Sequence, residues 1–206
     1  SVATVAANGV ITAVKSGDAK ITASVGEISG SVAVTVSIPA KLTLEPEKSE
    51  LVGVGKQVAL TPKVLDDAGR EVAGAQAIWS TSDGAIATID EGMVTAAGAG
   101  TAVIKAAVGE ASGTATIVIT HPAVAGIALE PATQTLEKVG DAVRLKANLT
   151  DEAGQPILGL NPTWSTTDEK VATVSDTGQV QAIKRGKAVI KATVGDKVAE
   201  AQIVVK

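Results

Sequence analysis

Carboxylate side chains that recur in two stretches of the chain are the residues with the clearest potential for chemistry. Clustered carboxylates can bind calcium, which takes about six to eight oxygen ligands, or can act as the acid and base of a glycoside hydrolase. The candidates are Asp66, Asp67, Asp83 and Asp90 in one stretch and Asp151, Glu152, Asp168 and Asp176 in the other. Their spacing does not resemble an EF-hand loop, and the connections between the expected strands are too short to build a hydrolase cleft. We therefore predict no cofactor, with calcium binding as the alternative.

Composition excludes most other catalytic sites. The chain has 206 residues and no cysteine, so it has neither a thiolate nucleophile nor a cysteine-ligated zinc site. A single histidine, His121, argues against a Ser-His-Asp triad or a multi-histidine metal site, and we expect it to be a solvated linker residue. The net charge of −4, without a basic run, argues against nucleic-acid binding. We predict that the chain is not an enzyme and has no catalytic or metal-binding residues.

An internal repeat organises the chain. The motif Trp-Ser-Thr-Ser-Asp at 79–83 recurs as Trp-Ser-Thr-Thr-Asp at 164–168, which is 85 residues further on. The stretch that follows this motif, of the pattern [IV]-A-T-[IV], occurs three times, at 2–5, 86–89 and 171–174. Each copy is followed by a hairpin of the pattern G-x-V-x-A or, in the first copy, Gly-Val-Ile-Thr-Ala.

Aligning these copies divides the chain into a half repeat at 1–37, a middle repeat at 38–120 and a last repeat at 121–206. The half repeat lacks the tryptophan and everything before it. We expect it to be the tail of a domain in a longer array, a segment completed by strands of another chain, or a segment that is disordered or packs irregularly on its neighbour. Because the first residue is Ser1 and not methionine, we expect a processed chain or part of a longer one.

Alternation of apolar and polar residues with a period of two predicts an all-β fold of half-buried antiparallel strands. No window shows a sustained helical period. In the middle repeat the strands are expected near 40–45, 49–52, 57–65, 76–81, 85–89, 93–97, 100–108 and 112–120. The first two can be one strand interrupted at Pro46, and an edge position suits this proline because it cannot donate to a ladder.

Each full repeat needs its own core, and its single tryptophan is the largest apolar side chain available. We predict that Trp79 and Trp164 plug the centres of the two sandwiches. The expected packing partners are Ile104 and Ile117 in the middle repeat and Ile190 and Ile203 in the last repeat. The alternative is that the indoles are exposed platforms for sugars, but no other aromatic residue extends such a surface.

Asp83 and Asp168 are predicted to shape the turns after the tryptophan strands, because a short acceptor side chain can bond the backbone two residues on.

The combination of motifs resembles the group 2 bacterial immunoglobulin-like repeat, the BIG2 domain. The W-S-[ST]-[ST]-D turn, the [IV]-A-T-[IV] strand, the following hairpin and a G-x-A-x-[IV]-x-A strand are present in both full repeats, and the last three also in the half repeat. The resemblance covers essentially all 206 residues. It implies tandem immunoglobulin-like antiparallel β-sandwich domains in an elongated array. Such domains occur in surface-exposed or secreted bacterial proteins, including adhesins, and in phage virion proteins, usually as spacers or binding modules.

These expectations favour a non-catalytic spacer array of a bacterial surface or secreted protein, such as an adhesin stalk or a filament component. The expected location is extracellular or at the cell surface. The expected partners are neighbouring Ig-like domains of a longer chain or other subunits of an assembly, with no nucleic acid and no membrane span. The alternatives are a module that binds a host protein or glycan, with loop residues of one repeat such as Lys184 to Lys187 as ligand contacts, and a domain for virion decoration or assembly in a phage.

Overall fold

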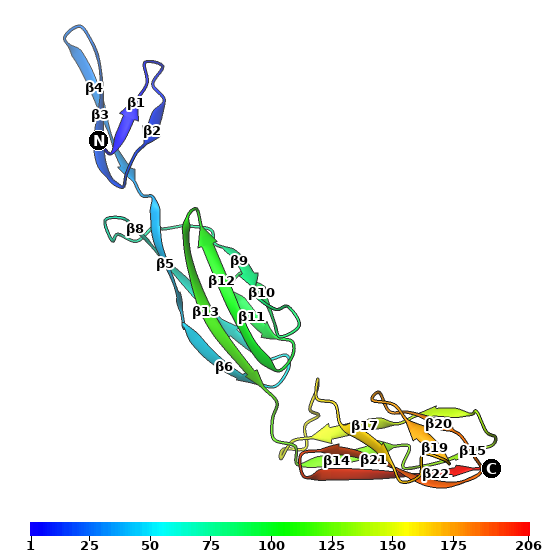
Figure 1. The fold of residues 1–206 in the computed structure, drawn as a ribbon. Coiled ribbons are helices and arrows are strands. Elements are labelled where there is room, and N and C mark those ends of the chain that lie inside the picture. Colours follow the sequence, from blue (N-terminus) through cyan, green and yellow to red (C-terminus); the bar gives the residue numbers. More distant parts are fainter. The chain divides into compact units, whose positions relative to one another are not determined.

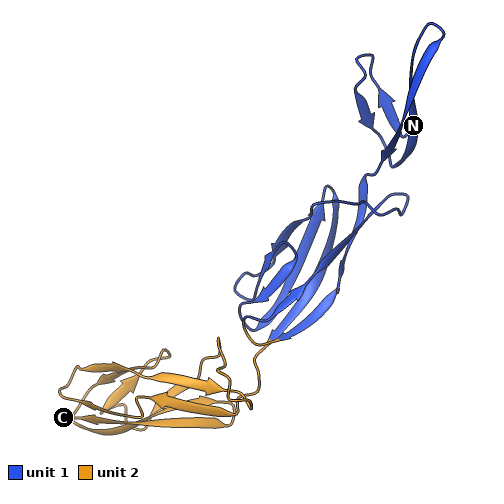
Figure 2. Ribbon diagram, turned by 180° about the vertical axis from the view of Figure 1, so that it is seen from behind, with its two compact units in different colours: residues 1–51, 55–119 blue, residues 52–54, 120–206 orange.

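The computed structural model describes all 206 residues, Ser1–Lys206, as strands and turns without a helix (Figure 1). The all-β prediction is therefore confirmed. The chain forms two compact units, coloured separately in Figure 2. One consists of Ser1–Leu51 together with Gly55–Ile119, and the other of Val52–Val54 together with Thr120–Lys206.

The middle repeat forms two sheet layers around an apolar core. Its strands are β5 (Pro39–Glu45), β6 (Lys48–Val52), β7 (Gln57–Ala59), β8 (Thr61–Asp66), β9 (Ile78–Thr81), β10 (Ala87–Asp90), β11 (Met93–Ala96), β12 (Gly100–Val108) and β13 (Ala111–Thr120). One layer has the strand order β6-β13-β12-β9, and the other contains the sheets β10-β11-β7 and β5-β8. Buried side chains from both layers, among them Leu44, Val94, Ile104 and Ile117, make one continuous core. The alternating pattern thus places one face of each strand in this core.

Two segments of the middle repeat leave one sheet and join another. At Pro46 the chain passes from β5, which pairs with β8, to β6, which pairs with β13. Proline has no N–H to donate, so a ladder is readily interrupted there. The single strand expected at 57–65 is wrong in detail, because Leu60 divides it into β7, paired with β11, and β8, paired with β5. The N–H of Leu60 donates instead to the carbonyl oxygen of Gly92, 2.8 Å away.

The last repeat has the same order of strands. They are β14 (Gly126–Glu130), β15 (Thr133–Leu136), β16 (Ala142–Arg144), β17 (Lys146–Thr150), β18 (Thr163–Thr166), β19 (Ala172–Val174), β20 (Gln179–Ala182), β21 (Gly186–Val194) and β22 (Lys197–Val205). One layer is β15-β22-β21-β18, and the other contains β16-β20-β19 and β14-β17. The expectation of antiparallel strands throughout is wrong here, since β15 runs parallel to β22. The reason is that the first strand continues in the same direction after Pro131 but joins the opposite sheet.

The half repeat consists of two hairpins, β1 (Ala3–Val5) with β2 (Ile11–Ala13) and β3 (Gly17–Val25) with β4 (Ile28–Val36). These correspond to β10–β13 of the middle repeat. The side chain of Val32 is 55% exposed, whereas Ala115 and Ala201 at the equivalent positions of the full repeats are 1% and 0% exposed. An apolar face that is covered in the full repeats is therefore open in the half repeat.

One contact between a glycine and an aliphatic side chain occurs in all three copies. A Cβ atom added to the glycine would lie 2.7–2.8 Å from a methyl group of the side chain, so any other residue would force that side chain to move. The pairs are Gly17 with Val2, Gly100 with Ile86, and Gly186 with Val171. The φ angles of these glycines, between 145° and 156°, also disfavour other residues. The glycines therefore fix how the [IV]-A-T-[IV] strand packs on the long hairpin in each copy.

Candidate functional site

The carboxylates considered as calcium ligands do not converge. No three acidic or histidine side chains form a group that could hold a metal ion. The side chain of Asp66 is fully buried, and its Oδ2 lies 3.0 Å from Nε of Arg70. Its Oδ1 accepts the backbone N–H groups of Ala68 and Arg70. In the last repeat, Oδ1 of Asp151 likewise accepts two backbone N–H groups. These carboxylates hold turns together.

The pKa of Asp66 reflects this setting. Burial raises the pKa of the carboxyl group, because the charged form loses solvation. The hydrogen bonds from the backbone and side chain of Arg70, the charge of its guanidinium and the hydrogen bond from Ala68 act in the opposite direction. Together these interactions hold the pKa of Asp66 below its usual value of 3.8.

Asp83 and Asp168 occupy matching turns after the tryptophan strands. Oδ1 of Asp83 accepts the N–H of Ala85 at 2.8 Å, and Oδ1 of Asp168 accepts the N–H of Lys170 at 2.9 Å. The carbonyl oxygen of each aspartate also accepts an N–H four residues further on. Each turn thus uses its aspartate to bind backbone donors within the same segment.

The two tryptophans lie at equivalent positions. Trp79 on β9 is paired with Ala106, and Trp164 on β18 is paired with Ala192. Both indoles pack against the core clusters but are partly exposed. The four isoleucines expected to surround them, Ile104, Ile117, Ile190 and Ile203, are 0% exposed. The buried centre of each repeat is thus aliphatic, and the indole closes one side of it.

A glycine lies against the ring of each tryptophan. A Cβ at Gly92 would lie 3.2 Å from Cζ2 of Trp79, and a Cβ at Gly178 would lie 2.8 Å from Cζ2 of Trp164. Both glycines have positive φ, 89° and 78°, in the hairpin turns before β11 and β20. The hairpin turn therefore packs so closely against the indole that a side chain at the glycine position would crowd the ring.

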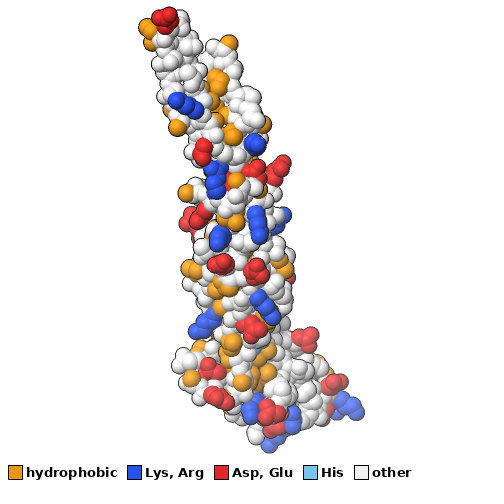
Figure 3. Space-filling view, turned by 90° about the vertical axis from the view of Figure 1, so that its left-hand side faces the viewer, with side chains coloured by type: hydrophobic (Ala, Val, Ile, Leu, Met, Phe, Trp, Pro, Cys, Tyr) orange, Lys and Arg blue, Asp and Glu red, His pale blue; other side chains and the backbone are white.

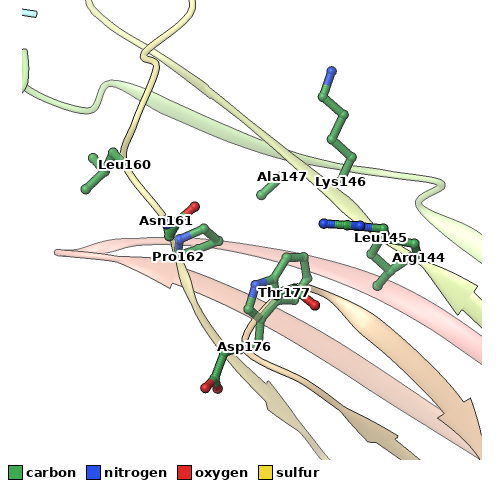
Figure 4. Close-up of a pocket in the computed structure, with 10 residues that line it drawn as sticks. Arg144, Leu145, Lys146, Ala147, Leu160, Asn161, Pro162, Asp176 and Thr177 are labelled. Carbon is green, nitrogen blue, oxygen red and sulfur yellow. The ribbon is translucent and has the colours of Figure 1, made fainter. Parts of the chain in front are cut away.

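A pocket of about 520 Å³ opens beside Trp164 in the last repeat. Its walls come from the end of β16 and the start of β17, from the segment before β18, from Trp164 and from the turn before β20. The lining residues are Arg144, Leu145, Lys146, Ala147, Leu160, Asn161, Pro162, Trp164, Asp176 and Thr177. In the view of Figure 4, Arg144 extends toward the segment with Asn161 and Pro162, while Lys146 and Asp176 extend away from the other labelled side chains. No motif in the sequence predicts this pocket.

Comparison with known families identifies the repeated unit. The model described as "Bacterial Ig-like domain (group 2)" matches residues 123–205, and the model described as "Bacterial Ig-like domain" matches residues 1–38. Residues 123–205 belong to the group 2 bacterial Ig-like domain family. The resemblance expected from the repeated motifs is therefore confirmed for the last repeat, and the half repeat matches the related model.

Three similar proteins illustrate what the chain resembles, and each is longer than this chain. Ice-binding protein 1 of Shewanella frigidimarina (strain NCIMB 400) is 32% identical over 201 residues, which cover 93% of this chain and 22% of that protein. The adhesin InvE of Yersinia pseudotuberculosis has a TM-score of 0.48 at 14% identity, covering 81% of this chain and 58% of InvE. The S-layer protein rSbsC(31-844) has a TM-score of 0.39 at 19% identity, covering 99% of this chain and 37% of that protein. The chain thus spans about a fifth of the curated relative that it matches.

The two full repeats differ at the rim of the pocket. Arg144 and Lys146 of the last repeat correspond to Ala59 and Thr61 of the middle repeat at the offset of 85 residues. The tryptophan and the buried leucine between the two rim positions are the same in both repeats. This difference between aligned copies is the sequence signal that could have pointed to the pocket.

The basic hairpin Lys184 to Lys187 does not form a comparable site. Among its residues, only Lys187 lines a second hollow, of about 330 Å³, on β21 and β22. On the face drawn in Figure 3, basic and acidic side chains are intermixed. The structure has no helix of the length and apolarity that crossing a bilayer requires.

His121 is partly exposed and so is less solvated than expected. Its Nδ1 atom is buried and has no hydrogen-bond partner. Cε1 of its ring would lie 3.6 Å from a Cβ at Gly159, in the loop before β18. The loop thus approaches the ring.

Proposed function

We propose that the chain is a non-catalytic spacer segment of a bacterial surface or secreted protein, such as an adhesin stalk or filament component. In this proposal it consists of tandem Ig-like β-sandwich domains at 38–120 and 121–206, preceded by half a domain at 1–37. Its partners are neighbouring Ig-like domains of a longer chain or other subunits of an assembly. Its location is extracellular or at the cell surface.

The observation that carries the proposal is that one folded unit recurs while its outer residues change. The glycine contacts of Gly17, Gly100 and Gly186 and the buried isoleucines repeat from copy to copy. Repetition of one core along a chain increases the length of the array. Each repeat is stabilised largely by its own core and by contacts with its neighbours. The match to only 22% of a curated relative also fits a segment of a longer protein.

The linkers support an elongated array. The sequences Ile38-Pro39 and His121-Pro122 contain neither glycine nor a serine run. Proline fixes its own φ and biases the preceding residue toward extended geometry, so these connections are short and stiff. With strands rising about 3.3 Å per residue, each full repeat would add about 35–40 Å to such an array.

The spacer role can be tested in a surface-displayed fusion that carries this chain between a membrane anchor and an epitope. Three versions are compared: the complete chain, a deletion of 38–120, and a replacement of 38–120 by a second copy of 121–206. The proposal predicts that the height of the epitope above the membrane falls on deletion and is restored by replacement. Equal heights for all three fusions, or failure of the replacement to restore height, would overturn it.

A second candidate function, binding of a glycan or a host protein, is favoured by one observation, the pocket beside Trp164.

A further inference from the structure

The pocket beside Trp164 has the dimensions of a ligand site. Its volume of about 520 Å³ lies within the range of pockets that hold small molecules. The buried Leu145, together with Ala147, Leu160, Pro162 and the indole, supplies apolar lining, and polar side chains supply the rim. An apolar wall with a few polar groups at its edge is the usual construction of such sites.

The rim is not required by the Ig-like fold. The middle repeat has the same order of strands and the same contact between indole and turn glycine, with Ala59 and Thr61 in place of Arg144 and Lys146. Its hairpin turn carries Asp90 and Glu91 where the last repeat has one carboxylate, Asp176. The same scaffold therefore has two cations at this place in one repeat and none in the other.

The two cations of the rim have no partner within the protein. The five ion pairs of the chain involve neither Arg144 nor Lys146. Both side chains are exposed. In Figure 4 the carboxylate of Asp176 points away from both. Two cations at the rim of one pocket, at positions where the middle repeat has Ala59 and Thr61, suit an anionic ligand.

We propose that this pocket binds an acidic saccharide, in which a pyranose ring packs on the indole of Trp164 and a ring carboxylate pairs with Arg144. A guanidinium binds carboxylates in a planar, bidentate geometry. The mobile ammonium of Lys146 provides a second contact at the rim, and Asn161 and Thr177 offer hydrogen bonds to sugar hydroxyl groups. This binding site goes beyond the spacer role and does not depend on it.

Other ligand classes fit less well. A neutral saccharide would leave both cations without a partner. Single-stranded nucleic acid is bound by a basic groove and several stacked aromatic residues, and this repeat has one tryptophan and no other aromatic residue. A uronic acid has both a pyranose ring that can pack on the single indole and a carboxylate that can pair with the cations.

The test uses the complete chain labelled with ¹⁵N and a trimer of galacturonic acid as the probe. The protein has two tryptophans, so its spectrum contains two indole N–H signals, one for each full repeat. We expect saturable shifts of the Trp164 signal at ligand concentrations of about 0.1–1 mM and no shift of the Trp79 signal. The same trimer with its carboxyl groups reduced to alcohols should bind at least about tenfold more weakly.

The matched variant is Arg144→Ala combined with Lys146→Thr, which installs the residues of the middle repeat. Because the middle repeat folds with these residues, the variant should keep its thermal unfolding midpoint but lose at least about tenfold in affinity for the acidic trimer. The proposal is overturned if the Trp164 signal is unmoved at about 10 mM trimer, if the Trp79 signal shifts equally, if the reduced trimer binds as tightly, or if the variant binds unchanged.

Discussion

Nη2 of Arg70 donates a hydrogen bond to the carbonyl oxygen of Val36, 3.0 Å away, and so connects the middle repeat to the half repeat. Nη1 of the same guanidinium lies 3.6 Å from Oδ2 of Asp18. Asp18 itself accepts a hydrogen bond from the hydroxyl of Thr35 at 2.8 Å. One side chain therefore reaches both strands of the β3–β4 hairpin while its Nε stays bonded to Asp66.

The turn that carries Arg70 does not need the guanidinium. In the last repeat the equivalent turn has Gln155, and its aspartate accepts the same two backbone N–H groups at 2.9 and 2.8 Å. The substitution Arg70→Gln should therefore preserve the backbone hydrogen bonds of the turn, while it removes the contacts with the half repeat and the ion pair with Asp66. We expect amide hydrogen exchange in the β3–β4 hairpin to become about two- to fivefold faster, as for the loss of a partly exposed ion pair.

The control for this prediction is Lys63→Gln, which removes a nearby positive charge that makes no ion pair. It should leave exchange in the hairpin unchanged. The difference between the two variants should shrink as salt is added, because the contact between Arg70 and Asp18 is exposed on both sides. Equal exchange in the two variants at low salt would contradict the role assigned to Arg70.

The carboxyl group of Asp66 makes the middle repeat sensitive to acid. Its pKa in the folded chain lies below the usual value of 3.8, so the unfolded chain binds the proton more tightly. The stability that this group contributes is therefore fully present above about pH 4 and is lost as the pH falls through the folded-state pKa. Denaturant unfolding at several pH values, followed by the Trp79 indole signal, should show a falling midpoint in this window. The variant Asp66→Asn should unfold more easily near neutral pH and show a smaller fall below pH 4.

Replacing the glycine beneath either indole should destabilise its repeat strongly. A Cβ at Gly92 would lie 2.8 Å from the carbonyl oxygen of Leu60, in addition to its contact with Trp79. At Gly178 the Cβ would lie 2.5 Å from the carbonyl oxygen of Leu145. We expect Gly92→Ala and Gly178→Ala to cost about 2–4 kcal/mol each, because strain at positive φ adds to a clash with backbone. The measurement is denaturant unfolding of each repeat by its own indole signal.

The variant Gly109→Ala separates these two causes. Gly109 also has positive φ, 59°, but a Cβ there would meet nothing within 4 Å. Its substitution should cost only about 1 kcal/mol, the cost of backbone strain without a clash. If Gly92→Ala were no more destabilising than Gly109→Ala, the close packing of turn and indole would not contribute to the free energy of unfolding.

Alternation in the sequence located most strands because it records which side chains face the core. It could not reveal that Leu60 divides one strand between two sheets, since Val58, Leu60 and Val64 keep the same alternation across the break. The break depends on the carbonyl oxygen of Gly92, which is distant in sequence. The turns of Asp83 and Asp168 involve neighbouring residues only, and local chemistry was enough to propose them.

The pocket beside Trp164 was harder to anticipate, because its walls come from three separate segments. No motif describes such an arrangement. The partial exposure of the indole was equally hidden, because sequence shows that a tryptophan is present in each repeat but not which side of the sandwich it closes. Only the contrast of Arg144 with Ala59 between aligned repeats carried a signal.

The open face of the half repeat leads to a prediction with matched controls in the full repeats. Val32, Ala115 and Ala201 occupy the same position in the three copies, at 55%, 1% and 0% exposure. An aspartate introduced at Ala115 or Ala201 would be buried without a partner, so Ala115→Asp and Ala201→Asp should unfold the repeat that contains them. The variant Val32→Asp should change the stability of the chain by less than about 1 kcal/mol, because its carboxylate stays in water.

The indole signals report the unfolding of the two full repeats, and the amide signals of β3 and β4 report the unfolding of the half repeat. Unfolding of the β3–β4 hairpin by Val32→Asp would mean that this face is covered in solution.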